Sequence, residues 1–194
     1  MAYPTVSTPY GLLPINRIDG MPYAGAIRQM PAASGNALIC NGDAVYIVDG
    51  YVDKVTDGAA GTPCGVAVGA QYTNSSGQTV QAQSLPASAT NGIVYVVDDP
   101  MALFKVAVVS GTTVISTTGV TRQVVGSNME LVINAGNATT GDSKTGVLAG
   151  SDDTTATLPV RVIDVVPATA LPSGNYVELL VKINTHQYNN TTGV

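Results

Sequence analysis

Charged side chains are scarce in this sequence, and tryptophan is absent. Only 11% of the 194 residues are Asp, Glu, Lys or Arg, whereas a typical globular chain has about 25% and a soluble monomer usually keeps about 25–35% of its surface charged. So few charges indicate a surface of Thr, Ser, Asn and Gly, together with surface that is buried against partner molecules. The net charge of −5 argues against nucleic acid as a partner, because binding to phosphates relies on Lys and Arg.

The residue types that form metal sites and nucleophilic centres are nearly missing. Cys40 and Cys64 are the only cysteines, and they match neither a disulfide framework nor a C-x-x-C motif. We expect both to be buried small hydrophobic residues, with a disulfide between them as the lesser alternative. His186 is the only histidine. It has no predictable Ser or Cys partner, and we expect it at the surface or at the end of a strand.

Adjacent carboxylates do not form a natural acid–base pair here. Asp98-Asp99 and Asp152-Asp153 are sequence neighbours, and neighbours on a strand point to opposite faces of the sheet. A Ca²⁺ site that adds Asp142 to the second pair is an alternative, but the spacing matches no known calcium loop. The Gly-rich stretches lack the spacing of a phosphate-binding loop. We therefore expect no enzymatic activity, no metal and no cofactor.

Long apolar runs are also missing. No run approaches the roughly 20 residues that span a bilayer, so we expect no membrane partner. The N-terminus has no basic region followed by an apolar core, and a secretory signal is therefore not expected.

The clearest structural feature is the stretch Gly92–Ser110. Two runs rich in Val, Ile, Tyr and Phe, Ile93–Val97 and Leu103–Val109, flank Asp98-Asp99-Pro100-Met101. They are short, bounded by turn residues and β-prone, so they predict two strands. Within them, the expected core anchors are Tyr95, Leu103 and Phe104, the last being the only Phe in the chain.

Further short strands are predicted on both sides of this centre. Asp49-Gly50 between Ala44–Val48 and Tyr51–Val55 is a strong signature of a two-residue type I′ hairpin. The other predicted strands are Cys64–Tyr72, Gln78–Gln83, Thr112–Ser116, Thr121–Val125, Met129–Asn134, Pro159–Val166 and Tyr176–Gln187. About ten short strands without a long amphipathic helix predict an all-β fold. We expect a compact β-sandwich or barrel-like domain, β-tulip or jelly-roll-like, over residues 37–187, and a flexible tail over 188–194.

Residues 1–36 differ from the rest of the chain. Five prolines recur among apolar residues, which excludes a long helix and predicts an extended N-terminal arm. Because the arm is too apolar for a solvated linker, it must lie on its own domain or on a neighbouring subunit, of which we favour the second. Its two cations, Arg17 and Arg28, could pair with carboxylates on the surface that it covers. The expected apolar contacts of the arm are Tyr3, Tyr10, Leu12, Leu13 and Tyr23.

Several stretches together resemble capsid decoration (cement) proteins of tailed bacteriophages, especially phages of aquatic bacteria. The resemblance covers most of the chain. It rests on Pro9–Asn16 (PYGLLPIN), Ala24–Pro31 (AGAIRQMP), Asn41–Val45 (NGDAV), Pro63–Val66 (PCGV), Tyr95–Val106 (YVVDDPMALFKV) and Gly136–Ser143 (GNATTGDS).

The resemblance implies a β-rich structural protein on the outer surface of the virion, made in the host cytoplasm. Its partners would be the major capsid protein and further copies of itself, as a trimer at local three-fold positions or as a dimer. By clamping neighbouring capsomers it would stabilise the shell, with the arm making the capsid and oligomer contacts. The alternative from the sequence is a head-fibre or adhesin-like β module that binds a host surface glycan.

Overall fold

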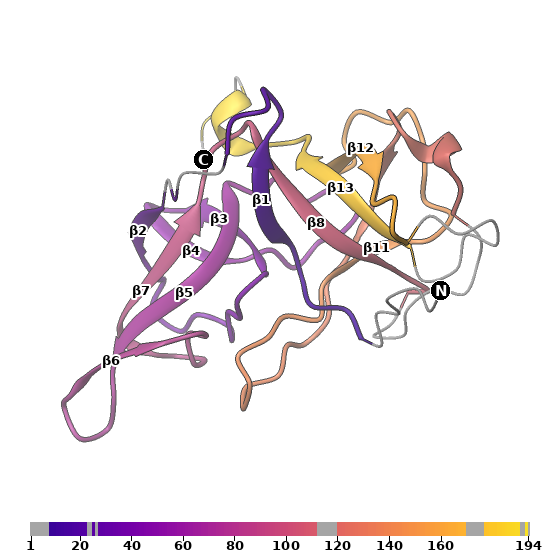
Figure 1. Ribbon diagram of the computed structural model, residues 1–194. Coiled ribbons are helices and arrows are strands. Elements are labelled where there is room, and N and C mark those ends of the chain that lie inside the picture. Colours follow the sequence, from indigo (N-terminus) through magenta and orange to yellow (C-terminus); the bar gives the residue numbers. More distant parts are fainter. Residues whose placement is uncertain are drawn as a thin grey trace.

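The computed structural model describes residues 8–22, 25, 27–111, 120–169, 177–190 and 193. These residues form two β-sheets and two short 3₁₀ helices (Figure 1). The predicted all-β class is thereby confirmed.

The first sheet is built around β8 (Ala102–Val109) and has seven strands. One edge of β8 pairs with β13. The other edge is shared: β1 pairs antiparallel with the first half of β8, and β11 runs parallel to its end. The order across the sheet is β10 (Leu131–Val132), β11 (Gly146–Leu148), β8, β13 (Glu178–Ile183), β12 (Val160–Val165) and β9 (Asn128–Met129), with β1 (Leu13–Arg17) beside β8.

The second sheet has six strands and is nearly closed into a barrel. Its order is β2 (Arg28–Pro31), β7 (Thr90–Val97), β5 (Gly65–Thr73), β3 (Ala44–Val48) and β4 (Tyr51–Lys54), with β6 (Thr79–Ala82) paired to β5. A bridge between Ala32 and Val52 brings the end of β2 to β4, and the N–H of Ala33 donates to the carbonyl of Val52 at 3.1 Å. These two contacts join the outermost strands of the sheet.

Alternate residues of the barrel strands fill two separate cores. In β5, Val66 packs into the core between the two sheets, while the next residue, Ala67, packs inside the barrel. Ala44 and Val45 of β3 divide in the same way. The alternation follows from the two-residue period of a strand. Phe104 lies in the core between the sheets and is among the largest fully buried side chains, as expected of a core anchor.

The predicted hairpin at Asp49-Gly50 is confirmed. Val48 and Tyr51 pair directly across it, and both turn residues have the positive φ of a type I′ turn, 49° and 82°. The central pair of strands is also confirmed as β7 and β8.

Three predicted segments differ in the structure. The predicted strand Met129–Asn134 is divided into β9 and β10, which pair with β12 and β11 respectively. Thr121–Val125 is not a strand, because the Thr121 side chain accepts a hydrogen bond from the N–H of Gln123 and starts the 3₁₀ helix η1 (Arg122–Val124). The expected tail begins instead with η2 (Gln187–Asn189), where Tyr188 contacts Asp98. The predicted strand Thr112–Ser116 lies outside the described residues.

The described part of the expected N-terminal arm belongs to the chain's own domain. β1 joins the first sheet and β2 joins the second, so this segment is extended but woven into both sheets. Pro14 is accommodated because β1 pairs on one side only, with a register irregularity next to the proline. Leu12 and Met30 are buried in the two cores. The sequence left open whether the arm lies on its own domain or on a neighbouring subunit. The described residues lie on their own domain.

Adjacent leucines test whether the N-terminal segment stabilises the domain. Leu12 is 1% exposed and Leu13 is 45% exposed. We expect Leu12→Ala to lower the free energy of unfolding by about 2–5 kcal/mol, because it leaves a cavity in the core, and Leu13→Ala to change it by no more than about 0.5 kcal/mol. Equilibrium urea denaturation measures both, and equal small losses would show that the segment is not part of the folded core.

Candidate functional site

Two chain segments cross between the sheets side by side. One is the β7–β8 turn, Asp98–Met101, and the other joins β1 to β2. The N–H of Ile18 donates to the carbonyl of Met101 at 2.9 Å, which ties the two segments together. We call this place the crossover. It positions the two arginines that the sequence singled out.

Each arginine of the N-terminal segment pairs with one of the two adjacent aspartates. Arg17 lies 3.2 Å from Asp99 and 3.3 Å from Asp19. Arg28 lies 2.9 Å from Asp98. The two aspartates thus serve different partners, as neighbours on an extended backbone do. The expected pairing of these arginines with carboxylates is confirmed, with partners in the same chain.

Tyr188 connects the C-terminal segment to the crossover. Its hydroxyl donates to Asp98 at 3.0 Å and accepts from Arg28 at 3.2 Å, and the guanidinium carbon lies 5.4 Å from the centre of the Tyr188 ring. Burial, followed by the hydrogen bond to Asp98, raises the pKa of Tyr188 to about 12. The hydroxyl therefore stays protonated at neutral pH and remains a donor.

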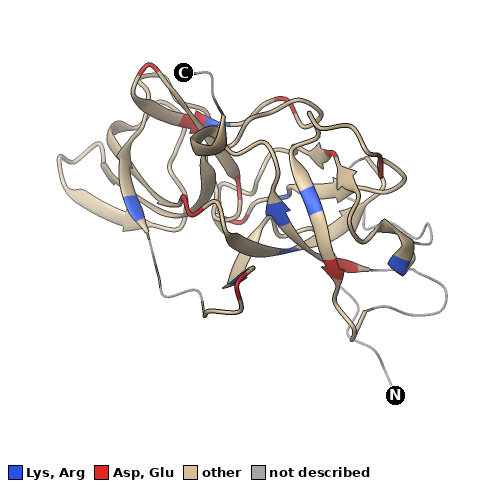
Figure 2. Cartoon of the chain, turned by 90° about the horizontal axis from the view of Figure 1, so that it is seen from above, with Lys and Arg blue, Asp and Glu red and all other residues tan. Residues whose placement is uncertain are grey.

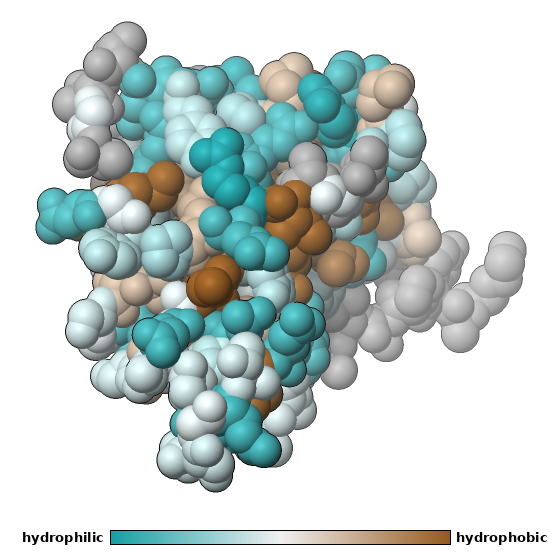
Figure 3. All heavy atoms as spheres, turned by 90° about the vertical axis from the view of Figure 1, so that its left-hand side faces the viewer, coloured by the Kyte–Doolittle hydropathy of each residue, from teal (hydrophilic) through white to brown (hydrophobic). Residues whose placement is uncertain are grey.

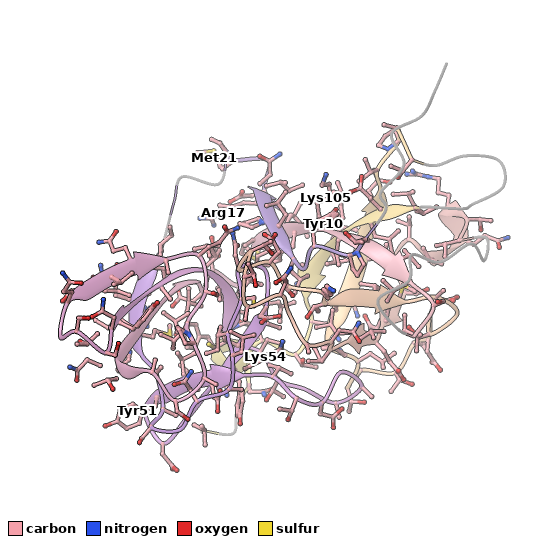
Figure 4. All side chains as sticks on the ribbon, turned by 90° about the horizontal axis from the view of Figure 1, so that it is seen from below. Tyr10, Arg17, Met21, Tyr51, Lys54 and Lys105 are labelled. Carbon is pink, nitrogen blue, oxygen red and sulfur yellow. The ribbon has the colours of Figure 1, made fainter. Side chains whose placement is uncertain are left out.

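Large apolar side chains lie exposed around the crossover. Met21 is 60% exposed and projects from the edge of the molecule in Figure 4. Ile18 and Met101, whose backbones are hydrogen-bonded to each other, and Ile27, which precedes Arg28, are also exposed. We call these four residues the crossover patch. Since the neighbouring arginines and aspartates are paired with each other, the patch is flanked by neutralised charges.

Tyr10 makes an internal contact. Its hydroxyl donates to Glu178 Oε1, while Lys105 Nζ lies 3.3 Å from the same oxygen and 5.4 Å from the Tyr10 ring (Figure 4). Burial and the adjacent Glu178 raise the pKa of Tyr10. Tyr10 thereby covers the polar face of β13, which explains why Glu178 is buried.

The other residues predicted to make contacts are dispersed. Leu12 is in the core and Leu13 is exposed on β1. Tyr3 and Tyr23 lie outside the described residues. Of the predicted core anchors, Leu103 and Phe104 are buried, whereas Tyr95 is half-buried with its hydroxyl 3.3 Å from Gln71. The structure thus brings Arg17 and Arg28 to the crossover and places Tyr10 and Leu12 against the domain.

A buried ion pair, not predicted from the sequence, joins two loops to the end of β4. Asp43 is fully buried and its Oδ2 accepts from Lys54 Nζ at 3.0 Å and from the N–H of Cys40 at 2.8 Å. Its Oδ1 accepts from the hydroxyls of Ser143 at 2.6 Å and Thr145 at 3.3 Å. Lys54 also donates to the carbonyl of Asn134 at 2.9 Å.

The loops meet so closely there that glycine is required. A Cβ on Gly11 would lie 2.5 Å from the carbonyl oxygen of Gly42, and φ is positive at both glycines. Because every oxygen of Asp43 is occupied by internal donors, the cluster is suited to holding the loops together and not to general acid–base catalysis. The two-residue period of a strand could have indicated that Lys54 is buried. Lys54 follows the buried Val52 by two residues on β4, so both side chains point to the inner face.

His186 and both cysteines are buried. His186 comes three residues after β13, so its expected place at a strand end is confirmed, but it is not at the surface. Its Nδ1 accepts from the N–H of Tyr188 at 3.2 Å, and burial lowers its pKa. Both cysteines are free and buried, as expected, and burial raises their pKa values to about 11 for Cys40 and about 12 for Cys64.

Comparison of the chain with protein-family models, curated proteins and solved structures found no match. Among the described residues, no group of three or more His, Cys, Asp or Glu side chains could hold a metal ion. Within the same part of the chain, no helix has the length and apolar character needed to cross a membrane.

Lys54→Met tests the buried ion pair. Removing the ammonium leaves the carboxylate of Asp43 buried without its charge partner, and we expect a loss of about 3–5 kcal/mol of unfolding free energy. Lys182→Met, on the half-exposed face of β13, is the matched control with an expected change of at most about 0.5 kcal/mol. The double variant Asp43→Asn/Lys54→Met should lose less than the sum of the single variants. Chemical denaturation of the wild type, Asp43→Asn, Lys54→Met and the double variant measures the coupling, with Lys182→Met as the control. Additive losses of the two single variants would contradict the coupling.

The buried His186 predicts a pH-dependent stability. Because its pKa is lowered in the folded protein, the unfolded chain binds the proton more readily. The contribution of His186 is therefore present above its unfolded pKa of about 6.5 and is lost as the pH falls below it. Thermal unfolding at pH 7.5 and pH about 5 should show a larger loss for the wild type than for His186→Gln, which does not titrate. A wild-type-minus-variant difference that stays constant with pH would rule out this linkage.

Proposed function

We propose that this chain is a structural virion protein, a capsid decoration protein that binds the outside of a major capsid protein shell. The observation that carries the proposal is the convergence of the sequence stretches behind the resemblance. Those at residues 9–16 and 95–106 pair as β1 and β8, and the described part of that at 24–31 reaches the crossover through the ion pair of Arg28 with Asp98. Those at residues 41–45 and 136–143 meet at the ion-paired Asp43.

The surface supports a role in association. Charged residues are few and scattered over long neutral stretches (Figure 2), and hydrophobic areas reach the surface between hydrophilic ones on the barrel side (Figure 3). Interfaces between protein subunits are depleted of charge in the same way. We assign the shell contact to the crossover patch, because the two ion-paired segments of the crossover carry four exposed large apolar side chains.

The proposed mechanism is clamping by apolar burial. A standard interface buries about 1,600 Å², and each 100 Å² of its apolar part contributes about 2.5 kcal/mol before entropy costs. When a decoration protein rests on two neighbouring capsomers, they can separate only if its contact with one of them is broken. The free energy of that contact therefore adds to the stability of the shell. Association of the chain with itself, as a trimer or a dimer, would link several such contacts.

A truncation of the expected arm, residues 1–36, is not a suitable test of shell binding. It would remove β1 and β2 together with the buried Leu12 and Met30, so the two sheets would each lose a strand. Surface substitutions in the crossover patch separate binding from folding.

The test measures binding of the purified protein to assembled heads that lack it. We expect the wild type to bind and Met21→Glu/Met101→Glu to bind more than about tenfold more weakly, because two charges would have to be desolvated in the contact. Val48→Glu places one charge on an exposed apolar position of the β3–β4 hairpin and should bind as the wild type does. Co-sedimentation counts the bound copies.

Circular dichroism establishes that both variants are folded as the wild type is. Equal binding of the double variant and the wild type would exclude the crossover patch as the contact. Failure of the wild-type protein to bind any head would exclude the decoration function itself.

A further inference from the structure

A groove of about 810 Å³ lies at the end of the barrel opposite the crossover. It is lined by the segment that follows β2, by Tyr51 at the start of β4, and by the loop that leads into β7. The side chains of Ser34, Tyr51, Ser88, Thr90 and Asn91 are exposed along it. We call it the barrel-end groove. Its volume is within the range of about 300–1,000 Å³ that is usual for ligand sites.

The lining of the barrel-end groove is neutral. Its side chains comprise one aromatic ring, several hydroxyls, one amide and otherwise Pro, Ala and Gly. Tyr51 is 49% exposed, so about half of the residue's surface is open to a ligand. Within the described residues, the hydroxyls of Ser34, Ser88 and Thr90 make no hydrogen bond to another protein group. A charged ligand would find no counter-charge in the groove.

The walls of the groove are held in place by a buried asparagine. Asn36 is 2% exposed, and its side chain donates to the carbonyl of Pro86 at 2.9 Å and accepts from the N–H of Ala89 at 3.1 Å. Its backbone carbonyl accepts from the N–H of Ser88 at 2.9 Å. These bonds join the two sides of the groove, so its shape is preformed.

Two lining residues have an uncommon backbone conformation. Ser88 and Asn91 have φ values of 54° and 50°, and the third non-glycine residue with positive φ among the described ones is in the β3–β4 turn. This conformation is rare for residues with a side chain. At Asn91 it accompanies a side-chain bond to Thr73 at 3.3 Å, which orients the amide at the rim.

We infer that the barrel-end groove binds a neutral carbohydrate. A sugar ring offers an apolar C–H face, which fits an exposed tyrosine, and a rim of hydroxyls, which fits Ser, Thr and Asn side chains that both donate and accept hydrogen bonds. The absence of charge from the lining disfavours acidic sugars and phosphates. This inference goes beyond the proposed attachment to a shell and does not depend on it.

The position of the groove is compatible with simultaneous attachment. β7 runs from the groove at Thr90 to the crossover after Val97, and its eight residues span about 26 Å. Figure 4 shows Met21 and Tyr51 on opposite edges of the molecule. A protein that rests on a shell through the crossover patch would therefore present the groove on a different side.

The test uses the full chain in solution and saturation-transfer NMR. Laminarihexaose, cellohexaose and maltohexaose serve as neutral probes, and an alginate hexasaccharide serves as the acidic one. We expect saturable binding of at least one neutral probe at millimolar concentration and none of the acidic probe. Tyr51→Ala should weaken this binding by about tenfold or more, since it removes the stacking surface.

Two further variants keep the result interpretable. Asn91→Gly removes the rim amide while favouring the positive φ, so it should stay folded and still weaken binding. Leu13→Ala removes an exposed side chain outside the groove and should bind as the wild type does. No binding of any neutral probe, equal binding of the acidic probe, or full binding by both groove variants would overturn the inference. None of these outcomes affects the head-binding test.

Discussion

The whole fold depends on strands of the barrel that are buried on both faces. A strand such as β5 sends Val66 to one core and Ala67 to the other, so a shift in register by one residue would exchange the contents of the two cores. The barrel interior combines large side chains such as Ile39 and Leu85 with the small Ala67 and Ala70 of β5. The first sheet then has to cover the outer face of the same strands. The N-terminal segment is needed for both tasks, since it supplies a strand to each sheet.

Local signals in the sequence predict the strands better than their partners. The Asp49-Gly50 hairpin and the pair around Asp98-Asp99 are specified by adjacent residues, and both are confirmed. The pairing of β1 with β8 joins residues about ninety positions apart, and no local pattern encodes it. Because this pairing could not be foreseen, the proline-rich and apolar N-terminal sequence was interpreted as an arm. The same properties also suit a strand at the edge of a sheet.

Buried polar residues were missed for a related reason. Glu178 alternates with core residues and therefore belongs to the outer face of β13, but Tyr10 covers it there. Lys54 lies two residues after Val52 and therefore on the same inner face of β4. A lysine can be buried there only when a carboxylate pairs with its charge. That partner, Asp43, lies on a preceding loop. The candidate site was partly predictable, because Arg17 and Arg28 were expected to pair with carboxylates. Which carboxylates they pair with depends on how the fold brings distant segments together.

Most cations of the chain form ion pairs with carboxylates of the same chain. Five of its eight cations, Arg17, Arg28, Lys54, Lys105 and Arg122, are in ion pairs with its own aspartates and glutamates. An exposed pair contributes at most about 1 kcal/mol to stability, so the larger effect of this pairing is on the surface. It leaves apolar and hydroxyl groups as the main means of contact. Attachment through such groups depends on buried area and hydrogen bonds, which salt screens far less than attraction between charges.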